Sequence, residues 1–261
     1  MRDIAQGGLR RLCSLELMRI GERAYACVPV RARHEAWFSL DVQRQLLFGR
    51  SGVDLVVDVG ANTGQFAQAL RRSYAGELLS FEPFAAAFEQ LERAAKSDPL
   101  WHTARYALGR ETERRNLKLS PLSVFHSFLS ANSYCEERFG SVSRPLAEES
   151  VEIRRMDDAV EEVVPHAAQR RIFVKLDTQG FDLQVFAGLE RLLGSVVGLQ
   201  SEVSVRPLYD GMADWLESLA VYQAAGFRVG GLFPVVVDND GLPIEYDCLM
   251  VRESGLVSAA R

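Results

Sequence analysis

Four acidic residues, each at or near the end of an apolar run, are the side chains in this sequence whose types and spacing suit chemistry. They are Asp58, Glu82, Asp177 and Glu202. Apolar runs that alternate with helical patterns are typical of parallel strands, whose carboxyl ends form the ligand-binding edge of an open α/β sheet. We therefore expect the four carboxylates to share one edge, where they can accept hydrogen bonds, take up a proton or coordinate a metal.

The segment 55–64 is the clearest ligand-binding signal. Its apolar run ends in Asp58, and a loop of small residues from Gly60 to Gly64 leads into a helical pattern. A strand, a glycine-containing turn and a helix bring bare backbone close to a nucleotide-like ligand. Glu82 ends the next apolar run, at the distance after the loop where an acid binds ribose hydroxyls. Together the two signals predict a nucleoside-bearing cofactor, whereas the loop alone is equally consistent with a tight turn that binds nothing.

The loop also indicates which cofactor to expect. Its spacing, Gly60-x-x-x-Gly64, lacks the third glycine of the dinucleotide fingerprint that receives a pyrophosphate. Asp58, two residues before the first glycine, would repel a phosphate and attract a cationic amino-acid group. S-adenosylmethionine carries such a group, together with a ribose for Glu82.

Three residues are candidates for catalysis. Asp177 ends a strand that we expect beside the Asp58 strand, so it should face the reactive group of the cofactor as a base, a positioning group or a metal ligand. The alternative is a helix N-cap, because a helix is expected from about Asp182. Glu202 ends the following strand and can share any of these roles. His126 lies in a polar loop, where it is either the base for an alcohol or a surface histidine.

Composition bounds the class of protein. The chain has 261 residues, 48% of them hydrophobic and 25% charged, with a net charge of −5. These values predict a globular protein with no nucleic-acid partner and no membrane contact. Charged residues interrupt the first 30 positions, so we expect no signal peptide, and the cysteines show no C-x-x-C spacing. We interpret them as isolated buried or reduced thiols of a cytoplasmic protein: Cys13, Cys27, Cys135 and Cys248.

The pattern along the chain predicts two regions. Residues 1–50 look helical and are interpreted as an extension, a lid or packing layer that can also support a homo-oligomer. From residue 51 to 261, alternating strand and helix patterns predict a parallel, doubly wound α/β sheet that ends in a hairpin over 235–251. Residues 120–150 interrupt this alternation with serines and aromatic residues. They are either a substrate-pocket segment or a surface loop.

At this point the sequence resembles the FkbM family of S-adenosylmethionine-dependent methyltransferases, and the likeness runs in order from about residue 53 to 252. The motifs that carry it are Asp58-Val59-Gly60-Ala61-Asn62, Ser80-Phe81-Glu82-Pro83, Ala107-Leu108-Gly109, Val174-Lys175-Leu176-Asp177-Thr178-Gln179-Gly180-Phe181-Asp182, Glu202-Val203-Ser204, Pro207-Leu208-Tyr209 and Tyr246-Asp247-Cys248-Leu249-Met250-Val251-Arg252.

The resemblance implies a class I methyltransferase (Rossmann-like) fold, with a seven-stranded, mostly parallel sheet whose last strand is antiparallel. It also implies methylation of a hydroxyl on a sugar, a polyketide or another secondary metabolite. By the same resemblance, the methionine end of the cofactor would contact Asp58, Gly60 and Asn62, with Gly64 and Gln65 beside them. The ribose would contact Glu82, and the adenine would contact Phe84 and Leu108. Asp177 would face the methyl group. Relatives often carry Glu where this chain has Asp182, so a direct role for that position is not implied, and the resemblance does not fix the base.

The sequence therefore predicts an S-adenosylmethionine-dependent O-methyltransferase acting on a small hydroxylated acceptor. No set of ligands is dense enough to require a metal, although a divalent ion could assist an alcohol of high pKa. Two alternatives remain. A short-chain NAD(P)-dependent oxidoreductase is disfavoured by the missing third glycine and by the lack of a Tyr-x-x-x-Lys pair. A non-catalytic module that keeps the cofactor pocket belongs to a different class.

Overall fold

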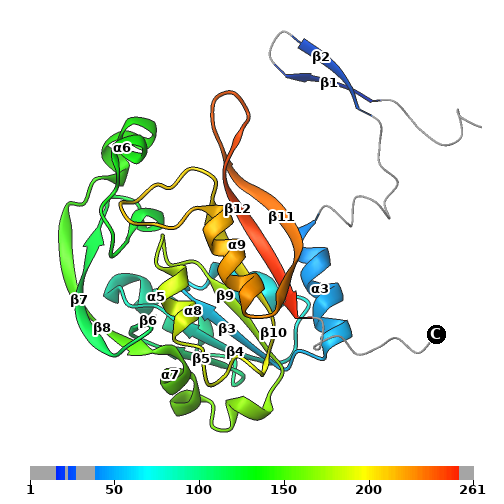
Figure 1. Cartoon of the computed structure of the whole chain (residues 1–261). Helices are drawn as coiled ribbons and strands as arrows, with labels where there is room; N and C mark the ends of the chain where they lie inside the picture. Colours follow the sequence, from blue (N-terminus) through cyan, green and yellow to red (C-terminus); the bar gives the residue numbers. More distant parts are fainter. Residues whose placement is uncertain (1–15, 21–22, 28–38, 253–261) are drawn as a thin grey trace, which may run out of the picture. The chain divides into compact units, whose positions relative to one another are not determined.

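The computed structural model describes residues 16–20, 23–27 and 39–252 (Figure 1). The chain divides into two units, residues 1–43 and 44–261, which are described separately. In the first unit, β1 (Glu16–Ile20) and β2 (Arg23–Cys27) pair as antiparallel strands. The expected helix is therefore wrong for these residues, and Gly21 between them is a poor helix former. The roles predicted for residues 1–50 as a lid or oligomer contact stay predictions.

The helical prediction is confirmed at the end of this segment by α3 (Leu40–Ser51). No helix among residues 39–252 is both long enough and apolar enough to cross a membrane.

The second unit is built on a seven-stranded sheet with the order β11-β12-β10-β9-β3-β4-β5. The bounds are β3 (Leu55–Val59), β4 (Glu77–Phe81), β5 (Trp101–Ala104), β9 (Ile172–Leu176), β10 (Val196–Ser204), β11 (Phe227–Val237) and β12 (Pro243–Arg252). Neighbours from β10 to β5 are parallel, and β12 is antiparallel to both β10 and β11. The predicted mostly parallel sheet with an antiparallel last strand is confirmed.

The central strands are apolar because both of their faces are covered. Every residue of β3 and of β9 is buried, which explains why these strands appear as continuous apolar runs rather than as alternating patterns. The helices that follow the strands are α4 (Gln65–Leu70), α5 (Ala85–Ala95), α7 (Met156–Val163), α8 (Asp182–Ala187) and α9 (Trp215–Ala224). The core therefore holds the strand ends in fixed positions, as a ligand site requires.

Residues 107–155, here called the insert, form a second sheet with the order β6-β8-β7. Its strands are β6 (Ala107–Gly109), β7 (Glu113–Leu119) and β8 (Ala147–Arg155), and η2 (Ser123–Phe125), α6 (Ser133–Phe139) and η3 (Gly140–Ser143) lie between β7 and β8. Asn132 caps α6 by accepting the amide hydrogen of Cys135, whose side chain is buried. The insert is therefore a folded element, and the interpretation of 120–150 as a surface loop is wrong. Its polar residues include Asn132, which caps α6, and Ser143, whose hydroxyl donates to the carbonyl oxygen of Gly140.

Candidate active site

A cavity of about 410 Å³ lies at the carboxyl ends of the parallel strands. The strand ends contribute Gly60, Asn62, Glu82, Asp177 and Glu202 to its wall. The insert and the β11–β12 hairpin supply most of the rest, including Leu108, Leu117, Val124, Phe125, His126, Phe128, Phe139, Val235, Val236 and Glu245. The sheet edge predicted to bind a ligand is thus hollow, and it is walled by segments far apart in the sequence.

Backbone contact between two strand-end loops forms the base of this edge. Gly60 has φ of +78°, and a Cβ atom placed on it would lie 1.9 Å from the carbonyl oxygen of Asp177. The amide of Asp177 in turn donates to the carbonyl oxygen of Val59 at 3.1 Å. Only glycine permits both this conformation and this approach, which is the physical reason for the glycine in the β3–α4 loop.

The Glu82 carboxylate is held by two backbone amides. Oε2 accepts the amide hydrogen of Asn62 and Oε1 that of Phe84, each at 2.8 Å. Asn62 has φ of +50°, a left-handed conformation that asparagine tolerates better than most residues. Burial raises the pKa of Glu82 to about 7, against these two hydrogen bonds, which lower it. Each oxygen keeps a second lone pair, so the carboxylate can still accept hydroxyl hydrogens.

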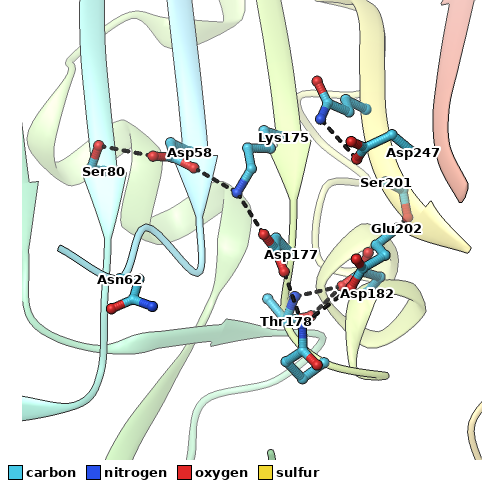
Figure 2. Close-up of polar contacts among 12 residues, drawn as sticks. Asp58, Asn62, Ser80, Lys175, Asp177, Thr178, Asp182, Ser201, Glu202 and Asp247 are labelled. Carbon is cyan, nitrogen blue, oxygen red and sulfur yellow. Dashed lines mark hydrogen bonds and ion pairs between the residues drawn. The ribbon is translucent and has the colours of Figure 1, made fainter. Parts of the chain in front are cut away.

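Asp58 faces a lysine that the sequence interpretation missed. Lys175 Nζ lies 3.3 Å from Asp58 Oδ1 and 3.1 Å from Asp177 Oδ2, between the two carboxylates (Figure 2). Burial alone would lower the pKa of Lys175, but the two carboxylates raise it above its ordinary value, so the lysine is charged. Burial raises the pKa of Asp58, against the effect of Lys175.

Asp58 is 1% exposed and is not among the residues that line the cavity. Its charge is balanced by Lys175 rather than presented to a ligand. The signal in the sequence was the position of Lys175, two residues before Asp177, which puts both side chains on the same face of a strand. The register of β3 against β9 then places Lys175 opposite Asp58.

Gln179 joins two further carboxylates. Its Nε2 donates to Asp177 Oδ1 at 3.2 Å and to Glu202 Oε2 at 3.1 Å. Its Oε1 accepts the hydroxyl hydrogen of Tyr209 at 3.0 Å, and its backbone carbonyl accepts that of Ser127 at 2.7 Å. Gln179 has φ of +50°, and these contacts hold that conformation. The amide bridges two groups that would otherwise repel each other, and neither Gln179 nor Tyr209 was predicted.

Glu202 and Glu245 form the acidic end of the cavity. Burial is the main cause that raises the pKa of Glu202 well above its ordinary value, and Asp177 and Glu245 add to the effect. Glu245 is 5% exposed, accepts the hydroxyl hydrogen of Ser204 at 2.7 Å, and has a pKa that burial also raises. The sequence interpretation missed Glu245 because it considered the ends of parallel strands. This residue lies near the beginning of an antiparallel one.

His126 lines the cavity on the side of the insert. Its Nε2 lies 3.1 Å from the carbonyl oxygen of Ser120, which only accepts, so Nε2 carries the hydrogen and Nδ1 is the acceptor. The ring meets Phe84 edge-on, with 4.8 Å between centroids. Burial lowers the pKa of His126, which keeps the imidazole neutral.

Asp182 stabilises the turn after β9. Its Oδ1 accepts the backbone and hydroxyl hydrogens of Thr178 at 2.9 and 2.5 Å, and its Oδ2 accepts the hydroxyl hydrogen of Ser201 at 2.7 Å. These contacts engage both oxygens away from the cavity. Asp182 is the first residue of α8, whose N-cap position is Phe181 without a side-chain hydrogen bond, so the N-terminal capping role considered for Asp177 is wrong.

The structure brings together most of the predicted site residues. Those that line the cavity are Gly60, Asn62, Glu82, Leu108, His126, Asp177 and Glu202, and those outside the lining are Asp58, Gly64, Gln65 and Phe84. A Cβ on Gly64 would lie 3.0 Å from both Leu91 and Trp101, so this glycine serves helix packing. Gln65 is exposed at the beginning of α4. The cofactor contacts predicted for these residues stay predictions.

The described part of the chain contains no group of three or more His, Cys, Asp or Glu residues arranged to hold a metal ion. Cys135 and Cys248 are buried free thiols, as predicted for these two residues, whereas Cys13 lies outside the described residues.

An α/β sheet whose strand ends surround a cavity is the arrangement in which open parallel sheets bind ligands, nucleotide cofactors among them. Residues 58–229 match the family described as "Methyltransferase FkbM domain". Because the match spans more than half of the chain, this protein belongs to the FkbM methyltransferase family, and its sheet is the class I methyltransferase sheet that the sequence predicted. No significantly similar sequence was found among proteins with curated descriptions.

Solved structures of similar fold include several methyltransferases. Magnesium protoporphyrin IX methyltransferase from Synechocystis PCC 6803, with bound S-adenosylmethionine, is 10% identical with a TM-score of 0.42, over 85% of this chain and 80% of that one. Fibrillarin from Aeropyrum pernix, also with S-adenosylmethionine, is 9% identical with a TM-score of 0.45, over 92% and 84%. An O-methyltransferase of neocarzinostatin biosynthesis is 10% identical with a TM-score of 0.40, over 80% of this chain and only 52% of that one.

Proposed function

We propose that this protein is an S-adenosylmethionine-dependent O-methyltransferase that methylates a hydroxyl of a sugar or of another secondary-metabolite acceptor. The observation that carries the proposal is the single cavity wall on which Gly60, Glu82 and Asp177 meet, within a domain of the FkbM methyltransferase family. Two carboxylates that follow β4 and β9, on either side of β3, suit a molecule that carries ribose hydroxyls at one end and a positive charge at the other.

The residues on the wall fit this cofactor. Glu82 offers acceptor oxygens for the ribose, and buried Leu108 offers an apolar surface for the adenine. The backbone at Gly60 and Asn62 and the Asp177 carboxylate lie where the sulfonium end would bind. When bound, S-adenosylmethionine supplies an electrophilic methyl group on a positively charged sulfur.

The residues of the chain then have separable tasks. Asp177 is fixed at both oxygens, by Lys175 and by Gln179, so we assign it the positioning of the charged centre and the acceptor. Glu202 reaches the same cavity and its pKa is raised, which makes it a stronger base than an ordinary carboxylate once it is ionised. We therefore assign to Glu202 the removal of the proton from the attacking hydroxyl. Neutral His126 is the second candidate for this role.

Calorimetry of the full chain with S-adenosylmethionine, S-adenosylhomocysteine and NAD tests the cofactor. We expect binding of the first two, a loss of about tenfold in Glu82→Gln, and no change in the exposed control Glu89→Gln. Preference for NAD would overturn the proposal in favour of an oxidoreductase.

Methyl transfer from labelled S-adenosylmethionine to a panel of glycosides and polyketides tests the reaction. Asp177→Asn and Glu202→Gln should each lower the turnover number more than they weaken cofactor binding. Cofactor binding without transfer to any acceptor would favour the non-catalytic module.

A further inference from the structure

The cavity wall carries acidic groups and no strongly basic ones. Four carboxylates line it, from Glu82, Asp177, Glu202 and Glu245, and no lysine or arginine is among the lining residues. His126 is the one imidazole among them, and burial lowers its pKa, so it adds no positive charge at neutral pH. The cavity is therefore a poor host for an anion.

The lysine and arginine side chains near the cavity are all outside its lining, so they do not make it a better host for an anion. Lys175 lies behind the wall, and its ammonium group already contacts the carboxylates of Asp58 and Asp177. Arg138, on α6, is outside the lining and donates to the carbonyl oxygen of Val237 at 3.4 Å. Arg115 lies with its guanidinium 5.9 Å and 5.4 Å from the ring centroids of Phe128 and Phe181, and it too is outside the lining.

The part of the cavity away from Glu82 is suited to hydrogen-bond donors. Glu202 and Glu245 come from the neighbouring strands β10 and β12, where Ser204 pairs with Glu245 in register. Each carboxylate accepts one hydrogen bond within the protein, Glu202 from Gln179 and Glu245 from Ser204. A carboxyl group has about four acceptor positions when it is ionised and keeps some of them when it is protonated. Both groups can therefore accept further hydrogens, from hydroxyls or from a protonated amine.

The surroundings of these two carboxylates are apolar. Phe125 and Phe139 of the insert lie on the cavity wall with ring centroids 5.1 Å apart, and Leu208 and Val236 are also on the wall. At the solvent side, Val124 and Val235 are 55% and 48% exposed while also lining the cavity. A ring with an apolar face and a hydroxylated edge matches this combination of apolar wall and acidic end.

We infer that the acceptor reaches the cavity without a phosphate or carboxylate near the methylated hydroxyl, as a neutral or amine-bearing ring whose hydroxyls are recognised by Glu202 and Glu245. The inference rests on the proposed function and goes further by naming a specificity. If the acceptor is a sugar, a diphosphate beside the methylated hydroxyl would face these carboxyl groups, so we expect the sugar to have left its nucleotide carrier. A glycosyl-transfer reaction, which releases that diphosphate, must then supply the substrate before it is methylated.

Small aromatic probes test the charge preference without knowledge of the natural acceptor. Ligand-observed NMR on the protein loaded with S-adenosylhomocysteine would compare benzylamine, benzyl alcohol and benzoate, which share a ring and differ in charge. We expect affinity to fall in that order, with benzylamine at least tenfold tighter than benzoate. Equal or tighter binding of benzoate, or no binding of any probe, would overturn the inference.

Paired variants connect the preference to the two residues. Glu202→Gln combined with Glu245→Gln should reduce the ratio of benzylamine to benzoate affinity at least tenfold. The control, Glu137→Gln combined with Asp210→Asn, removes two exposed carboxylates outside the lining and should leave the ratio unchanged. If the control moves the ratio as much as the cavity variant, net charge is responsible and the inference is wrong.

The order of reactions is tested with labelled S-adenosylmethionine and one set of sugars presented both as phenyl glycosides and as nucleotide diphosphate sugars. Glycosides should be methylated with at least tenfold higher kcat/KM. Preference for the nucleotide forms would overturn the inference while leaving the methyltransferase activity in place. Failure of the protein to bind S-adenosylhomocysteine, measured first, would instead count against the proposed function.

Discussion

The two sides of the cavity are built by different means. We call the part around Gly60 and Glu82 the cofactor side, and the part around the insert and the β11–β12 hairpin the acceptor side, after their proposed roles. On the cofactor side, main-chain hydrogen bonds between parallel neighbours set the geometry, as when Gly60 donates to the carbonyl oxygen of Phe81 at 3.1 Å. On the acceptor side, the β11–β12 hairpin belongs to the sheet through the pairing of β12 with β10, but the insert meets the sheet through contacts such as that of Ser127 with Gln179. Sheet register therefore fixes the first side, whereas the part of the second side that the insert builds depends on single side chains that can change independently.

The largest expected contrast is between two glycines of positive φ, one on each side. Gly60→Ala would drive a Cβ atom into the Asp177 backbone. At Gly140, with φ of +65°, an added Cβ atom would have no atom within 4 Å beyond its chain neighbours. We expect Gly60→Ala to lower the free energy of unfolding by more than about 4 kcal/mol and to abolish cofactor binding. Gly140→Ala should cost about 1–3 kcal/mol of backbone strain. Urea denaturation measures both, and equal losses would erase the distinction between the two sides.

Lys175→Met should have the next largest effect, because it leaves buried Asp58 without its cation. Removing one partner of a buried pair costs about 3–5 kcal/mol, measured by urea denaturation at pH 7. The double variant Asp58→Asn/Lys175→Met removes the charge as well as its partner and should recover most of the loss. A double variant no more stable than the single one would show that Lys175 acts through packing alone.

Glu82 gives the cofactor side a pH dependence. Its pKa is raised to about 7, and the ionised form accepts ribose hydrogens best, so cofactor affinity should rise between pH 6 and 8, as followed by calorimetry. In Glu82→Gln the affinity should be about tenfold lower at pH 8 and no longer vary with pH. Without ligand, the folded state binds this proton more tightly than the unfolded state. The contribution of Glu82 to stability is therefore lost as pH rises from about 4.5 to about 7.

The smallest predicted effect lies on the acceptor side and has the opposite sign from those of Gly60→Ala and Lys175→Met. The pKa of Glu245 is raised by burial. Ionising this side chain therefore costs stability as the pH increases above the ordinary pKa of glutamate. Glu245→Gln should therefore increase the free energy of unfolding at pH 8 by about 1 kcal/mol, seen as a higher thermal midpoint. At pH 4 it should have little effect. A lower midpoint at pH 8 would mean that the Ser204 hydrogen bond outweighs the cost of burying the charge.

The sequence predicted the shared sheet edge well because its signals are local. The spacing of Gly60, Glu82 and Asp177 along alternating apolar runs places all three at one sheet edge, and all three line the cavity. Lys175 escaped notice although it stands within a quoted motif. Its role depends on the register of β3 against β9, which no local pattern specifies.

The acceptor side was largely hidden from the sequence. Gln179 and Tyr209 are 30 positions apart, and their contact arises only when the turn after β9 meets the segment after β10. Residues 120–150 looked like a loop because the helices within them, η2, α6 and η3, are short. Contacts of this kind depend on packing between distant segments, so composition and periodicity do not reveal them.

The reversed direction of β12 has a consequence for how such proteins diversify. The turn that closes the β11–β12 hairpin is fastened by hydrogen bonds among Asp238, Gly241 and Leu242 (Figure 1). Residues could be gained or lost at that tip while the buried ends of both strands kept their partners. Under the proposed function, lineages could thus exchange one acceptor for another by remodelling a few residues at this tip, while Gly60, Glu82 and Asp177 stayed in place.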